Sequence, residues 1–136
     1  MDCPPEEEPE LREALQAHGI HPILLLAPTT PDDRIAAVSG LAGGFVYYVS
    51  MTGVTGAAFA GDEALVARVQ RIRSLAGLPV AVGFGIATPE DAALVARSAD
   101  GVVVGSALVR LVEAHGVQAP RPLRELTAAL KAALEG

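Results

Sequence analysis

The sequences VGFGI at residues 82–86 and VGSA at residues 104–107 decide the fold, because each ends an apolar run with glycine. A helix between the two stretches would return the chain to a neighbouring parallel strand. In parallel β/α barrels, two consecutive strand-to-helix turns of this kind form a phosphate site from backbone N–H groups and a helix N-terminus. Glycine lets the backbone approach the anion without an intervening Cβ. The pair therefore predicts a phosphate-binding edge of a parallel sheet.

The rest of the chain alternates between short apolar runs and segments with helical periodicity. This alternation predicts a parallel sheet with right-handed crossovers, either open and doubly wound or part of a barrel. The glycine turns favour the barrel. Because a whole barrel needs about 200 residues or more, 136 residues predict a single domain, 1–136, that forms half of one. We expect strands at residues 22–27, 45–50, 79–84 and 102–104, and helices near residues 5–18, 31–41, 62–75, from 89, 107–114 and 123–134.

Composition narrows the class of protein further. Hydrophobic residues make up 51% of the chain and charged residues 19%, as in a globular protein with a large core. The net charge of −6 and the lack of a basic stripe exclude a nucleic-acid partner. No apolar run reaches the ~18 residues that cross a bilayer. The one cysteine, Cys3, cannot form an internal disulfide, so we expect a soluble protein of the reducing cytoplasm.

The loop SMTGVTGA at residues 50–57 is the second motif. Its glycines and small polar residues suit a lid that closes over a ligand, although a merely long loop has the same composition. Before it, Tyr47 and Tyr48 must point to opposite faces of their strand.

Other polar residues of the chain predict no catalytic or metal chemistry. The three histidines lack the spacing of metal ligands. Thr30-Pro31-Asp32-Asp33 and Thr88-Pro89-Glu90-Asp91 each offer a capping threonine, a proline at the first helical position and acids in the first turn, so capping explains these acids. Residues 120–122, with two prolines, are expected to interrupt the chain before the last helix. No acid–base pair accompanies the phosphate-binding edge.

These stretches resemble the tryptophan synthase alpha subunit family over nearly the whole chain. The resemblance implies strands five to eight of a (β/α)8 barrel that cleaves indole-3-glycerol phosphate to indole and glyceraldehyde 3-phosphate. It implies no cofactor in this chain, because pyridoxal phosphate belongs to the family's beta subunit, which receives the indole. The matching stretches are DCPPEE at 2–7, LAPTT at 26–30, YYVS at 47–50, TGVTGA at 52–57, PVAVGFGI at 79–86 and VVGSA at 103–107.

The resemblance also assigns residues to roles. Thr55 falls on the threonine of the closing loop, which orients a catalytic aspartate, and Asp2 falls near the beta-subunit face. Met51 stands where some members carry arginine. The implied phosphate-binding residues are Gly56, Gly85, Gly105 and Ser106. The residues implied to line the indole pocket are Leu25, Tyr47, Phe84 and Val103.

The resemblance places the family's two acid–base carboxylates, a glutamate on strand two and an aspartate after it, before everything in this chain. We therefore expect the chain to be a fragment that is inactive alone. Two alternatives stay open: another phosphate-binding barrel enzyme, or a non-catalytic half-barrel that acts as an interaction module. Four strands without closure leave open edges, so we expect self-association, or a sheet that curls to cover its interior.

Overall fold

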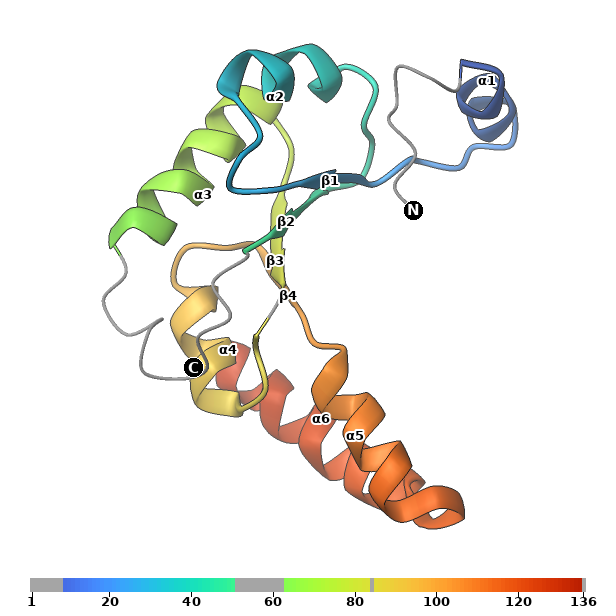
Figure 1. Cartoon of the computed structure of the whole chain (residues 1–136), viewed down its shortest axis with the longest axis vertical. Coiled ribbons are helices and arrows are strands. Elements are labelled where there is room, and N and C mark those ends of the chain that lie inside the picture. Colours follow the sequence, from blue (N-terminus) through green and yellow to red (C-terminus); the bar gives the residue numbers. More distant parts are fainter. Residues whose placement is uncertain (1–8, 51–62, 84, 136) are drawn as a thin grey trace.

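The computed structural model describes residues 9–50, 63–83 and 85–135 (Figure 1). Within these ranges, four parallel strands alternate with helices, and the strand order β1-β2-β3-β4 follows the sequence. The strands are β1 (Leu24–Leu26), β2 (Val46–Val49), β3 (Val80–Gly83) and β4 (Gly101–Val103). The helices are α1 (Pro9–Ala17), α2 (Asp32–Ser39), α3 (Glu63–Ala76), α4 (Pro89–Ala96), α5 (Ser106–His115), the 3-10 turn η1 (Gly116–Gln118) and α6 (Pro120–Glu135).

Every step in the sheet runs in one direction, from β1 to β4, and every pair of neighbours is parallel. A doubly wound sheet reverses its order at a switch point, and this sheet has no such reversal. The order therefore confirms the expected half of a barrel: four parallel strands alternating with helices.

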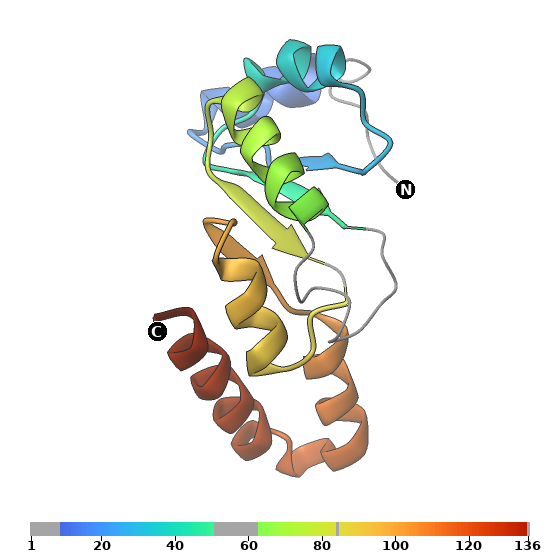
Figure 2. The same ribbon diagram turned by 90° about the vertical axis from the view of Figure 1, so that its left-hand side faces the viewer.

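The hydrophobic core lies on one face of the sheet, beneath α2, α3 and α4 (Figure 1), and Figure 2 shows these helices as a layer in front of the strands. Successive side chains of a strand point to opposite faces, so only alternate residues reach this core. Helix α6 joins it by packing along α4. The buried cluster comprises Leu26, Ile35, Val46, Tyr48, Val69, Ile72, Val80, Val82, Ile86, Ala92, Val95 and Leu130.

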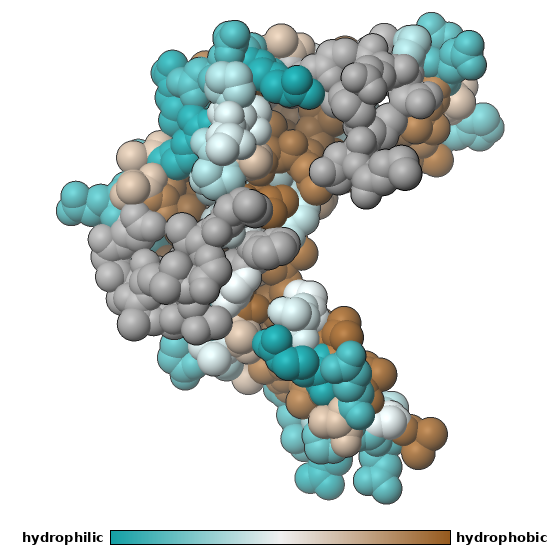
Figure 3. Space-filling model, in the orientation of Figure 1, coloured by the Kyte–Doolittle hydropathy of each residue, from teal (hydrophilic) through white to brown (hydrophobic). Residues whose placement is uncertain are grey.

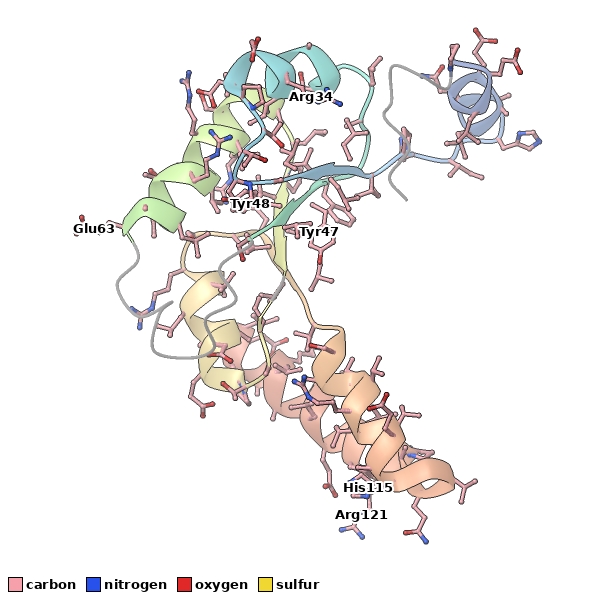
Figure 4. The ribbon with its side chains drawn as sticks, viewed as in Figure 1. Arg34, Tyr47, Tyr48, Glu63, His115 and Arg121 are labelled. Atoms are coloured by element: carbon pink, nitrogen blue, oxygen red, sulfur yellow. The ribbon has the colours of Figure 1, made fainter. Side chains whose placement is uncertain are left out.

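The other face of the sheet is open. Leu25, at the centre of β1, is 56% exposed. Tyr47 points to this open side and Tyr48 to the helices, as Figure 4 shows, which confirms the prediction for the two tyrosines. The molecule is hollowed here, with apolar residues along the hollow (Figure 3). We expected either self-association or a sheet that curls to cover its inner face. The sheet does not curl in this way.

Helix ends follow the local sequence with two exceptions. Gly19 and Gly77 follow α1 and α3 with positive φ, as expected of glycines that end helices. Residues 120–122 do not interrupt the chain, because both prolines lie in the first turn of α6, where their missing N–H groups need no partner. Thr30 does not cap α2: its Oγ1 accepts a hydrogen bond from Ala27 N at 2.9 Å.

Helix α2 is held instead by ion pairs with α3. Asp32 accepts from Arg68 at 2.6 Å and from Arg71 at 2.8 Å, and Arg68 also donates to the carbonyl of Thr30. The hydrogen bond from Arg71 lowers the pKa of Asp32 most, and the bond from Arg68 lowers it further. None of the helices in the described ranges is long and apolar enough to cross a bilayer.

Candidate functional site

The two glycine turns leave the same edge of the sheet from neighbouring strands. Gly83 of β3 pairs in register with Val103 of β4. Gly85 lies two residues after Gly83, and Gly105 lies two residues after Val103. Both turns therefore start at the carboxyl edge of adjacent parallel strands. Ligands of parallel β/α proteins bind at this edge.

Helix α5 begins at this edge with backbone donors that no side chain caps. Its N-cap is Gly105, which makes no side-chain cap hydrogen bond. The N–H groups of Leu108 and Val109 already bond to the Gly105 carbonyl, at 3.0 and 3.1 Å. The N–H groups of Ser106 and Ala107 precede them and have no acceptor within the helix. With the Ser106 hydroxyl, which is exposed, these groups can donate to an anion.

Helix α4, which follows the neighbouring strand, begins in the opposite way. Thr88 Oγ1 accepts from Asp91 N at 3.2 Å, and Asp91 Oδ2 accepts from the N–H groups of Thr88 and Ala87 at 3.1 and 3.2 Å. This reciprocal capping box occupies the first donors of α4 with its own side chains. Of these two helix starts, that of α4 carries a side-chain cap and that of α5 does not.

Two positions require glycine for steric reasons: Gly83 in β3 and Gly85 in the turn that follows it. Gly85 has φ +80°, a left-handed conformation that costs other residues energy. A Cβ at Gly83 would lie under 3.0 Å from the Tyr47 ring. Gly83 thus gives space to Tyr47, whose hydroxyl lies beside it on the open face, a role that the sequence motif alone did not assign.

Three of the implied pocket residues share the open face of the sheet. Leu25 pairs in register with Tyr47, and Val103 pairs with Gly83, against which the Tyr47 ring lies. Together they form an apolar surface below the two glycine turns, with one polar group, the Tyr47 hydroxyl. Asp2, Thr55, Gly56 and Phe84 lie outside the described residues.

Sequence reasoning missed the residues that hold β2, β3 and β4 together. Ser50 is buried, and both its N–H and its Oγ donate to the Gly83 carbonyl at 3.1 Å. At the opposite end of β3, Asp100 accepts from Val80 N at 2.8 Å and from Arg73 at 2.9 Å. The hydrogen bond from the Val80 N–H lowers the pKa of Asp100 most, and the bond from Arg73 lowers it further.

These polar contacts fix the strands from which the turns leave. Their signal in the sequence is weak, since a serine after a strand and an aspartate before one are common in loops. Within the described residues, no three His, Cys, Asp or Glu side chains come together as metal ligands.

The described residues define a protein of the parallel β/α barrel class, with an uncapped helix start and a glycine turn at its carboxyl edge. A family model described as "Tryptophan synthase alpha chain" matches residues 1–135. The chain therefore belongs to the tryptophan synthase alpha chain family.

Individual relatives agree with this assignment. A tryptophan synthase alpha chain from Novosphingobium aromaticivorans is 53% identical over 134 residues, which are 98% of this chain and 50% of the relative. One from Erythrobacter litoralis is 55% identical over 130 residues, 96% of this chain and 50% of the relative. The chain thus spans about half the length of the curated relatives that it matches.

Solved structures show the same relationship. The tryptophan synthase alpha chain from Legionella pneumophila superposes with a TM-score of 0.83 at 36% identity, covering 99% of this chain and 50% of that one. A chain from a study of the tryptophan synthase α2β2 complex of Pyrococcus furiosus gives 0.82 at 35% identity, with 96% and 53% covered. The four-stranded sheet therefore matches about half of a longer barrel chain.

Proposed function

We propose that this chain forms the phosphate-binding half of an enzyme that cleaves indole-3-glycerol phosphate to indole and glyceraldehyde 3-phosphate. The observation that carries the proposal is the uncapped start of α5, beside the left-handed turn at Gly85. Backbone donors that are not occupied by caps, at the carboxyl edge of a parallel sheet, suit a phosphate ester. Membership of the family supplies the substrate class.

In this proposal the substrate lies across the open face. Its phosphate accepts hydrogen bonds from the backbone at Gly85, Gly105 and Ser106, and Gly56 joins them from the loop at residues 50–57. Its indole ring packs on the apolar surface of Leu25, Tyr47 and Val103, and Phe84 completes the pocket. Thr55 orients a catalytic carboxylate when that loop closes.

We propose further that the 136-residue chain does not catalyse the reaction by itself. Acid–base catalysis at the indole ring would need two free carboxylates near the pocket, and such catalysis contributes typically 10²–10⁴-fold. The buried acid nearest to the turns, Asp91, is occupied by the α4 cap. Asp32 and Asp100 are occupied by arginines.

The partner in this proposal is a tryptophan synthase beta subunit, with Asp2 near the shared face. An α2β2 complex is named for the Pyrococcus furiosus relative. Pyridoxal phosphate would remain with the beta subunit, so the alpha chain would use no cofactor. We place the assembly in the cytoplasm, where Cys3, the single cysteine of this chain, stays reduced.

The phosphate site is tested by Gly105→Asp, which puts a carboxylate at the start of α5. Nothing lies within 4 Å of a Cβ at Gly105, so the variant fits. Glycerol 3-phosphate or indole-propanol phosphate is titrated while the amide resonances of Ser106 and Ala107 are followed by NMR. We expect saturable shifts in the wild type. Repulsion in the variant weakens binding at least tenfold, about 1.4 kcal/mol.

Gly40→Asp is the matched control, because a Cβ there also meets nothing within 4 Å and Gly40 lies near the end of α2. It should bind like the wild type. Equal binding by Gly105→Asp, or no shift at Ser106, would contradict the site. Stronger binding of indole-propanol phosphate than of glycerol 3-phosphate supports the indole pocket over another phosphate-binding barrel. Indole release by the purified chain at the rate of a full-length relative would contradict its inactivity.

A further inference from the structure

Ser50, which directly follows β2, makes two hydrogen bonds to a single acceptor in the neighbouring strand. Its N–H and its Oγ both donate to the carbonyl of Gly83, each at 3.1 Å. Ser50 is 3% exposed and Gly83 is buried, so both bonds lie away from water. A carbonyl oxygen accepts two hydrogen bonds, and a buried one that loses a partner costs free energy. The last residue of β3 is thereby tied to the end of β2.

This carbonyl lies two residues before Gly85, where the chain turns away from the sheet. Gly85 has φ +80° and is partly exposed, whereas Ile86, directly after it, is 2% exposed. Beyond Ile86, the Asp91 carboxylate of the α4 cap accepts from the N–H of Ala87 at 3.2 Å. The turn is therefore anchored on both sides of Gly85. On the strand side, the Gly83 carbonyl sets the direction in which the chain leaves β3.

We propose that the Ser50 hydroxyl is a positioning group for phosphate binding, which acts through the turn after β3 and not by contact with the ligand. This inference rests on the proposed phosphate site at Gly85, Gly105 and Ser106. The Ser50 hydroxyl is buried and donates its proton to the Gly83 carbonyl, so it does not donate to an anion. Its hydrogen bond favours the conformation that presents the Gly85 backbone. Phosphate then binds a turn that is already ordered, which strengthens the apparent affinity.

Ser98 provides a matched comparison, because it makes the same two bonds elsewhere in the fold. Its N–H and its Oγ both donate to the Val95 carbonyl, at 3.1 and 3.2 Å, and Ser98 is 7% exposed. The two serines differ in position. Ser98 follows α4 and precedes β4, so it lies toward the amino edge of the sheet, opposite to the glycine turns. Removal of either hydroxyl deletes one buried hydrogen bond, but only that of Ser50 lies at the proposed phosphate site.

The test compares Ser50→Ala with Ser98→Ala in the 136-residue chain. The urea midpoint of each variant measures the stability that the lost hydroxyl contributes. Glycerol 3-phosphate is then titrated while the amide resonances of Gly85 and Ser106 are followed by NMR. We expect Ser50→Ala to weaken phosphate binding at least about fivefold, the factor that one net hydrogen bond supplies. Ser98→Ala should bind phosphate like the wild type.

A second measurement needs no ligand. In Ser50→Ala the turn loses one of its anchors, so the Gly85 amide resonance should shift or broaden before any phosphate is added. The same resonance should stay unchanged in Ser98→Ala. Ser50→Cys keeps the size of the side chain with a weaker donor, so its phosphate affinity should fall between those of the wild type and Ser50→Ala. This variant also replaces Ser50→Ala in the comparison if the alanine variant does not fold.

Wild-type affinity in Ser50→Ala or in Ser50→Cys would overturn the positioning role and leave the proposed phosphate site intact. An equal loss of phosphate affinity in Ser98→Ala would overturn it as well, because lower stability would then explain both variants. So would an unchanged Gly85 resonance in Ser50→Ala, since the effect would not pass through the turn. If the wild type bound no phosphate, the proposed function itself would fail, and this inference with it.

Discussion

The two faces of the sheet are built from similar apolar residues, and they differ in what covers them. On the helix side, Val46, Val80 and Val82 are at most 2% exposed, and α3 and α4 pack over them. On the open side, Leu25 is 56% exposed in the same sheet. The difference teaches that the stability of this chain comes mainly from one face, while the other face is available for a ligand or a partner.

The starts of α4 and α5 form a second contrast of the same kind. The α4 start is closed by its own side chains, and the α5 start is open. Adjacent strands thus lead to one structural helix start and one that can bind an anion. Two pairs of variants test these contrasts, and a third pair tests the charge that ties β3 to β4.

The largest effect is expected on the covered face. Ile72 is fully buried in α3, so Ile72→Ala should lower the free energy of unfolding by about 2–5 kcal/mol. Leu25→Ala should lower it little, because the Leu25 side chain is 56% exposed. Urea unfolding of dilute protein followed by circular dichroism measures both. Equal losses for the two variants in dilute protein would mean that the faces do not differ as described.

The helix starts should respond to matched hydroxyl deletions. Thr88→Ala removes the α4 cap and should cost about 1 kcal/mol of unfolding free energy. Ser106→Ala removes an exposed hydroxyl with no capping role, so stability should change by less than about 0.5 kcal/mol. Its effect should show instead in weaker phosphate binding. A Ser106→Ala loss as large as that of Thr88→Ala would show that α5 is capped after all.

The smallest effect is expected from the charge that ties β3 to β4. The pKa of Asp100 is lower in the folded chain than its ordinary value, so its carboxylate stabilises the fold at neutral pH. This contribution is lost as the pH falls from about 4 through the lowered pKa. Asp100→Asn should therefore lower the urea midpoint at pH 7 and change it less near pH 3. Because the pair is partly exposed, the loss should stay below about 1 kcal/mol.

Glu125→Gln is the control for this pH dependence. Glu125 pairs with Arg121 on the surface of α6, where both side chains are more exposed than Asp100. The difference between its urea midpoint and that of the wild type should be small at both pH 7 and pH 3. A pH dependence as large as that of Asp100→Asn would assign the effect to overall charge and not to the β3–β4 contact.

Local chemistry explains which parts of the fold could be predicted. Apolar runs predicted every strand within two residues at either end, because a buried parallel strand needs apolar side chains on both faces. Thr88 and Asp91 predicted the α4 cap, which is a contact between residues three apart. The first turn of α6 was misjudged because two prolines in sequence suggest a break, and only the helix position shows that neither N–H is needed.

The sequence by itself determined the alternation of strands and helices, the glycine turns and the family, since these depend on residues near one another along the chain. Only the tertiary structure decided which face of the sheet is covered, that Gly83 makes room for Tyr47, and that Asp32 and Asp100 bind arginines. Such contacts join residues about 20 to 40 positions apart, and no local pattern encodes them. Burial and pairing at that range follow from how the layers pack, which is a property of the folded chain.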